Sequence, residues 1–171
     1  SSATMKNRII NGAMVIDQRN AGSSITPTNA QYSVDRWECA LTASSKYTAQ
    51  QSSTAPPGFI NSLKITSSSA YSVTSGDVFA MIQAIEGLNA ADLGFGTSSA
   101  STVTLSFWVQ SSLTGTFGGS LINYLNNRSY PFSYTIAAAN TRTKIAITIP
   151  GDTIGTWSTT NTGWCQIWFG L

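Results

Sequence analysis

The side chains that could perform catalysis in this sequence are few. Histidine is absent, which removes the commonest general base and metal ligand, and with it the serine and cysteine mechanisms that depend on histidine. A glycosidase needs two carboxyl groups about 5–9.5 Å apart across a cleft. Glu38 and Glu86 lie in expected strands, but no motif links them. We therefore expect a protein that is not an enzyme. The seven carboxylates are Asp17, Asp35, Glu38, Asp77, Glu86, Asp92 and Asp152.

Binding chemistry is better represented, because tryptophan and glutamine recur on strand faces that point away from the expected core. In the last apolar run Cys165, Ile167 and Phe169 form the natural inward set, so the residues between them face outward. Sugars are recognised by aromatic faces together with nearby amides and hydroxyls. If the strands concerned share one sheet, these residues form a carbohydrate-binding platform. Its members are Trp108, Gln110, Tyr124, Trp164, Gln166 and Trp168.

The alternative for the same tryptophans is that loops or an oligomer neighbour cover them, since large aromatic side chains are more often packed than ligand-bound. Trp37 alternates with polar residues and is expected in the core. Trp157 follows a turn-rich segment, where it caps the end of the fold or lines a loop-borne site.

Metal and redox chemistry have weak support. Asp17, Asp35 and Asp152 are conceivable ligands for a structural calcium ion, but no acidic calcium-loop motif is present, so we expect no cofactor. Cys39 and Cys165 fall on inward strand faces without metal-type spacing. The sequence leaves open whether they form a disulfide or remain buried free thiols.

Composition narrows the partners further. Charged residues make up only 9% of the 171 residues, against 25 serines and 22 threonines, so the surface is rich in hydroxyls. The nine Lys and Arg residues are scattered and the net charge is +2, which argues against nucleic acid as a partner. No run of about 18 apolar residues occurs, and we expect no membrane insertion.

The elements that must position these residues are strands. Apolar and polar residues alternate with period two, helical spacing is nearly missing, and Gly, Ser, Asn and Pro separate the runs. Residues 89–94 are expected to form one short helical turn. We predict an all-β fold, an antiparallel β-sandwich of the jelly-roll type, as a single domain over 7–171 preceded by a tether or expression remnant over 1–6. The expected strands are 36–42, 62–66, 78–86, 102–110, 119–124, 130–136, 144–149 and 163–169.

Two segments near the start carry a family resemblance. Asn7 to Arg19 reads N-R-I-I-N-G-A-M-V-I-D-Q-R, and Asp35-Arg36-Trp37 follows it. Both resemble the opening of C-terminal domains of bacteriophage tail-fibre and related phage structural proteins, and the likeness continues through Gln83–Gly87, Thr102–Ser111 and Ile149–Trp157. More distantly, the early N-G element and the T-V-T-L-S-F-W strand resemble jelly-roll carbohydrate-binding modules.

The resemblance implies a jelly-roll sandwich on a phage particle that contacts a host-surface polysaccharide or oligosaccharide, and fibres of this kind are usually homotrimers. We therefore expect a virion protein that acts outside the cell and recognises a host glycan. Two alternatives remain. One is a purely structural decoration or oligomerisation domain whose outward aromatics form an interface. The other is a sugar-binding module from a bacterial glycan-degrading enzyme.

Overall fold

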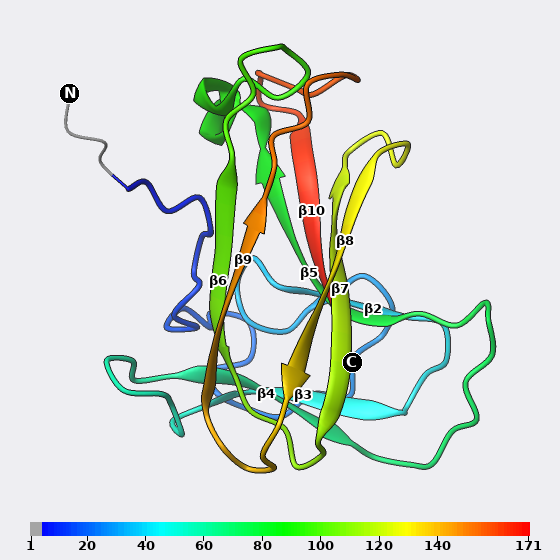
Figure 1. Cartoon of the computed structure of the whole chain (residues 1–171). Helices are drawn as coiled ribbons and strands as arrows, with labels where there is room; N and C mark the ends of the chain where they lie inside the picture. Colours follow the sequence, from blue (N-terminus) through cyan, green and yellow to red (C-terminus); the bar gives the residue numbers. More distant parts are fainter. Residues whose placement is uncertain (1–4) are drawn as a thin grey trace.

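The computed structural model describes residues 5–171, and almost all regular structure in them is β-strand (Figure 1). Two short 3-10 turns, η1 (Gly87–Asn89) and η2 (Ala91–Leu93), account for the expected helical turn. No helix in the described part of the chain is long and apolar enough to span a membrane. The strands are β1 (Gln31–Tyr32), β2 (Glu38–Leu41), β3 (Tyr47–Ser52), β4 (Ser62–Ser67), β5 (Phe79–Glu86), β6 (Val103–Val109), β7 (Gly115–Asn123), β8 (Ser129–Ile136), β9 (Thr143–Ile149) and β10 (Gly163–Gly170).

The strands pair antiparallel in three sheets. The largest has the order β1-β2-β5-β10-β7-β8, while β6 pairs with β9 and β3 pairs with β4. Three of these pairings are nested along the chain: β7 with β8, β6 with β9 outside them, and β5 with β10 outside both. In Figure 1, β6 and β9 lie in front of the six-stranded sheet, and β3 and β4 cross the lower end. The expected antiparallel sandwich is therefore confirmed.

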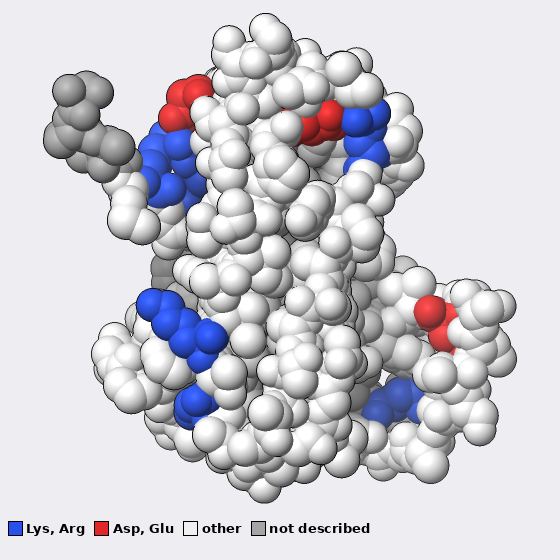
Figure 2. All heavy atoms as spheres, in the orientation of Figure 1, with Lys and Arg blue, Asp and Glu red and all other residues white. Residues whose placement is uncertain are grey.

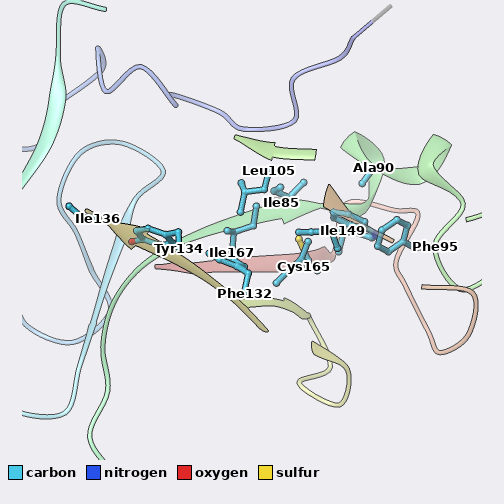
Figure 3. Close-up of a cluster of buried hydrophobic side chains, with 12 residues drawn as sticks. Ile85, Ala90, Phe95, Leu105, Phe132, Tyr134, Ile136, Ile149, Cys165 and Ile167 are labelled. Carbon is cyan, nitrogen blue, oxygen red and sulfur yellow. The ribbon is translucent and has the colours of Figure 1, made fainter. Parts of the chain in front are cut away.

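The main core lies between the six-stranded sheet and the β6–β9 pair. Alternation in β6 turns Leu105 and Phe107 inward, and register with β9 places Ile147 and Ile145 beside them. Figure 3 shows Leu105 beside Ile85, which belongs to the opposite sheet, and Ile149 and Ile167 are members of the same buried cluster. Such interlocking of apolar side chains from two inner faces is the usual core of a β-sandwich.

A second apolar cluster lies under β3 and β4. Its buried members include the expected core residue Trp37, and Ile9 and Phe169 pack against both this cluster and the main core. The Phe169 ring centroid is 5.9 Å from that of Trp37 and 5.1 Å from that of Phe107. Strand β3 was not expected from the sequence, because Tyr47–Ser52 contains few β-branched residues. It forms because it pairs with β4 over its whole length and makes a bridge between Ala49 and Ile25.

The segment before β1 is fastened to the core by one buried amide. Gln83 on β5 has no exposed surface, donates from Nε2 to the Ile10 carbonyl at 2.9 Å, and accepts from the Ile10 N–H at 2.8 Å. Arg8 pairs with Asp92 at 2.5 Å. Of the expected tether, residues 1–4 lie outside the described residues, and Met5 and Lys6 are exposed.

Both cysteines are buried free thiols. The strands that carry them are not neighbours, because β5 lies between β2 and β10. Pairing separates them because Cys39 is opposite Met81 while Cys165 is opposite Ile85, four residues further along β5. Burial raises the pKa of both thiols, which keeps them protonated and unreactive.

Candidate functional site

The six residues expected to form one platform are divided between different parts of the molecule. Trp108 lies on β6, opposite Lys144 of β9, on the outer face of the two-stranded sheet, and it is 36% exposed. Gln110 lies one residue beyond the end of β6 and is also exposed. Gln166 and Trp168 lie on the outer face of the six-stranded sheet. The alternation of apolar and polar residues predicts on which face of its strand each side chain lies, but not which sheet the strand joins. Strand β6 belongs to the two-stranded sheet, and β10 belongs to the six-stranded sheet opposite it. The expected single platform is therefore corrected.

Trp164 is the second correction, because it is inward and only 4% exposed. Gly163 is opposite Glu86 and Cys165 is opposite Ile85, so two steps along β10 match one step along β5. Such a β-bulge lets consecutive residues face the same side. The indole packs at 4.9 Å between centroids against Phe95 and at 5.3 Å against Trp157, which is half-buried at the loop end of the sandwich.

Tyr124 lies just beyond β7 and is 56% exposed. Its ring sits close to Gly163, where the absence of a side chain leaves room for it. It does not line the hollows described below.

Trp168 is held in a fixed position on the six-stranded sheet. The indole packs against an apolar cluster of Ala40, Ala80 and Ile82 from the adjacent part of the sheet. Its Nε1–H donates to the Gln166 Oε1 at 3.1 Å. Ala40 and Ala80 are buried although they belong to the outer face, because the large indole lies against these small side chains. The ring therefore keeps its orientation without a ligand.

Two open hollows meet at Trp168 and together form what we name the Trp168 trough. The first has a volume of about 610 Å³ and the second about 510 Å³, each in the range of small-molecule sites. The first hollow contains Gly118 and Gly170, which leave this part of the sheet surface without side chains. It is lined by Asp77, Val78, Phe79, Ala80, Thr116, Phe117, Gly118, Gly119, Ser120, Trp168, Gly170 and Leu171, and the second by Ile122, Asn126, Asn127, Arg128, Ser129, Gln166 and Trp168.

The second hollow is built largely by the turn between β7 and β8. Asn126 has a φ of 55°, a left-handed conformation that asparagine tolerates. Arg128 forms a two-bonded ion pair with Asp152, one bond being 2.8 Å from Nη2 to Oδ1. This guanidinium holds the pKa of the Asp152 carboxyl below its usual value. Asn126, Asn127 and Arg128 were not predicted as binding residues from the sequence, although a run of amides between two strands signals an exposed turn.

Asp77 contributes the acidic group of the first hollow. Its carboxylate accepts the Thr74 N–H at 2.8 Å, the Thr42 hydroxyl at 2.8 Å and the Tyr71 hydroxyl at 3.1 Å. The bond from the Thr74 backbone, followed by that from Thr42, lowers the pKa of Asp77. The carboxylate thus organises the loop between β4 and β5 that forms one wall of the hollow.

Of the remaining carboxylates, Asp17, Asp35 and Glu86 have protein partners, as does Asp92 in its pair with Arg8, whereas Glu38 has no side-chain hydrogen bond or ion pair within residues 5–171. Asp17 accepts the N–H groups of Asn20 and Gly22, Asp35 accepts that of Gln18, and Glu86 pairs with Arg36 at 2.7 Å. Within residues 5–171, no group of three or more Asp, Glu, Cys or His side chains is placed to hold a metal ion. Figure 2 shows charged side chains of both signs in small separate groups on a largely uncharged face.

Comparisons with known proteins give a likeness of fold. No family model matches the sequence, and no curated protein is significantly similar to it. Among solved structures, the chain is similar to the enzymatically active domain of tailspike protein 4 of bacteriophage CBA120, with a TM-score of 0.54 and 15% sequence identity. The match covers 95% of this chain and 19% of that chain, so the protein described here spans about a fifth of the length of that domain. What the two share is the arrangement of strands.

Proposed function

We propose that the protein is a non-catalytic carbohydrate-binding domain of a phage tail protein, and that it binds a surface polysaccharide in the Trp168 trough. The observation that carries the proposal is the junction of two open hollows at one immobilised indole, with amide side chains beside it. An aromatic ring offers an apolar face to the C–H surface of a sugar ring, and neighbouring amides bond to its hydroxyls.

The size and openness of the trough favour a chain rather than a single sugar. Its two halves lie on opposite sides of Trp168, so a bound oligosaccharide places one residue at the indole and further residues in each hollow. Single-site affinity for glycans is often low, and several copies of a domain on one particle raise avidity without new contacts.

The assignment to a phage tail rests on two independent likenesses. The sequence resembles phage tail-fibre domains at its N-terminal motifs, and the fold is similar to a domain of a phage tailspike. We therefore place the protein on the virion, acting at the host surface.

A binding module of a glycan-degrading enzyme would use the same trough. Tail genes beside the coding sequence are the expected gene neighbourhood, whereas an adjoining catalytic domain would favour that alternative.

The non-catalytic part of the proposal is supported by the carboxylates. Asp77 is the only carboxylate among residues 5–171 that lines either hollow, and four groups of Thr42, Tyr71 and Thr74 already donate hydrogen bonds to it. Glycoside hydrolysis uses two carboxyl groups on either side of the scissile bond. Although the similar tailspike domain is described as enzymatically active, this trough offers a binding surface with a single, occupied acid.

We also propose that the sandwich is a jelly roll. The nested pairing of β5 with β10, β6 with β9 and β7 with β8 supports this, because a jelly roll is formed when one long, nested set of hairpins wraps into two facing sheets.

The test is a glycan array probed with the multimerised protein, bacterial surface polysaccharides included, and repeated with two variants. Trp168→Ala should abolish binding or weaken it by about 1–3 kcal/mol, by analogy with other stacked flat ligands. Trp108→Ala, on the opposite sheet, is the matched control and should bind as the wild type does. Circular dichroism establishes that both variants fold.

Two other outcomes would argue against the Trp168 trough as a carbohydrate-binding site. A blank array for the wild type would favour the structural decoration alternative. Loss of binding in Trp108→Ala with retention in Trp168→Ala would move the site to the β6–β9 face.

A further inference from the structure

The polar atoms of the second hollow are fixed by a chain of hydrogen bonds that starts in the interior. Asn123, at the end of β7, is 1% exposed, and its Oδ1 accepts the backbone N–H groups of Asn127 and Arg128, both at 3.0 Å. Backbone N–H groups only donate, so the orientation of the Asn123 amide is determined. Its Nδ2 then donates to the Asn127 Oδ1 at 2.7 Å. The atom that Asn127 has left for a ligand is its Nδ2, a donor.

Gln166 is fixed by the same logic. The Trp168 indole N–H is a donor only, so the oxygen of the Gln166 amide must face it, as it does at 3.1 Å. Its Nε2 remains. Arg128 uses Nε and Nη2 on Asp152, which leaves Nη1. None of these three remaining nitrogen groups has a hydrogen-bond acceptor within residues 5–171, so all three present donors to whatever enters the hollow. The exposed side chains of Asn126 and Ser129 also line it, and their oxygens are not fixed by this chain of hydrogen bonds.

We propose that the second hollow selects a sugar that carries a carbonyl or carboxylate oxygen next to the residue stacked on Trp168, an inference that rests on the proposed carbohydrate binding. A hydroxyl accepts a hydrogen bond but also brings a hydrogen that needs an acceptor, which these three nitrogen groups do not supply. A carbonyl or carboxylate oxygen accepts without that cost. The predicted ligand is therefore a sugar that carries a hydrogen-bond acceptor, either the carbonyl oxygen of an acetamido group or the carboxylate of a uronate.

The test compares three oligosaccharides with the same β-1,4-linked backbone: a glucose tetramer, its N-acetylglucosamine counterpart and its glucuronate counterpart. Binding is measured by calorimetry for the wild type and for Gln166→Glu and Asn127→Asp. Each substitution keeps the oxygen that accepts the internal bond and replaces the outward NH₂ by oxygen. Asn161→Asp, in the loop before β10, is the matched control for an added carboxylate.

The expected result is about tenfold tighter binding of at least one acceptor-bearing tetramer than of the glucose tetramer, the size of one good hydrogen bond. Both variants should reduce this preference to about threefold or less, while Asn161→Asp retains it. A preference for the N-acetylated tetramer alone identifies a carbonyl acceptor, and one for the glucuronate tetramer alone identifies a carboxylate.

Two outcomes would overturn the inference but leave carbohydrate binding standing: equal affinity of the wild type for all three tetramers with loss in Trp168→Ala, or a preference that survives both variants. If the wild type binds none of the three tetramers, the inference is overturned as well. The glycan array then tests the proposed carbohydrate binding separately. If Asn127→Asp does not fold, Gln166→Glu decides the test, because Gln166 lies on the sheet surface and its oxygen is retained.

Discussion

At the scale of single residues, the buried side chains that make polar contacts hold distant segments together. Gln83 joins β5 to the N-terminal segment through two hydrogen bonds to Ile10. Gln83→Met keeps a similar volume but leaves both Ile10 groups without a partner. We expect a loss of about 1–3 kcal/mol in the free energy of unfolding, measured by urea denaturation. Gln110→Met, at an exposed position, should change it by at most about 0.5 kcal/mol, and equal effects of the two changes would contradict the assigned role.

The Arg128–Asp152 pair gives a prediction about pH. The pKa of Asp152 is lowered in the folded chain, so the pair stabilises the fold above the unfolded pKa, about 3.9 for aspartate, and this contribution is lost as the pH falls through the folded value. Asp152→Asn should therefore be less stable than the wild type at pH 6, and the difference should shrink below about pH 4. Urea midpoints across this range measure it, and a difference that does not depend on pH would contradict it.

At the scale of elements, the bulge in β10 decides which tryptophan is structural. Trp164→Ala removes a buried indole that packs against Phe95 and Trp157, and should cost about 3–5 kcal/mol of stability. Strict alternation would instead leave Trp164 exposed and the variant nearly neutral. Trp108→Ala is the comparison and should cost about 1 kcal/mol or less. Thermal unfolding of the two variants distinguishes the bulged strand from a regular one.

At the scale of the whole molecule, two apolar clusters are joined through Ile9 and Phe169, which pack against both. The Phe169 ring lies beside Trp37 of the second cluster and beside Phe107 and Phe132 of the main core. We expect the wild type to unfold in one cooperative transition, with tryptophan fluorescence and far-ultraviolet circular dichroism coinciding. Phe169→Ala should lower stability by about 3 kcal/mol or more and separate the two signals. Two transitions already present in the wild type would mean that the clusters are independent.

Much of the strand structure could be predicted from the sequence, because alternation is a local property. Residues 102–110 and 144–149 became β6 and β9 within one or two residues, with Leu105 and Phe107 inward as expected. Strand β7 begins at Gly115 rather than at 119, since pairing with β8 extends it through a glycine-rich stretch that reads as a turn. Of the site, Trp168 and Gln166 were predicted as outward binding residues, and their joint position on one strand is observed.

Local sequence pattern thus specifies the strand class, the inward and outward sets along most strands, and the small number of side chains that could perform catalysis. Which sheet each strand joins depends on tertiary pairing, which puts Trp108 and Trp168 on different sheets and creates the bulge that buries Trp164. Tertiary pairing also forms the trough, whose hollows arise where Gly118 and Gly170 meet across strands and where the β7–β8 turn reaches Gln166. The physical reason is that alternation repeats over two residues, whereas sheet order and hollows depend on pairings between residues far apart in the chain.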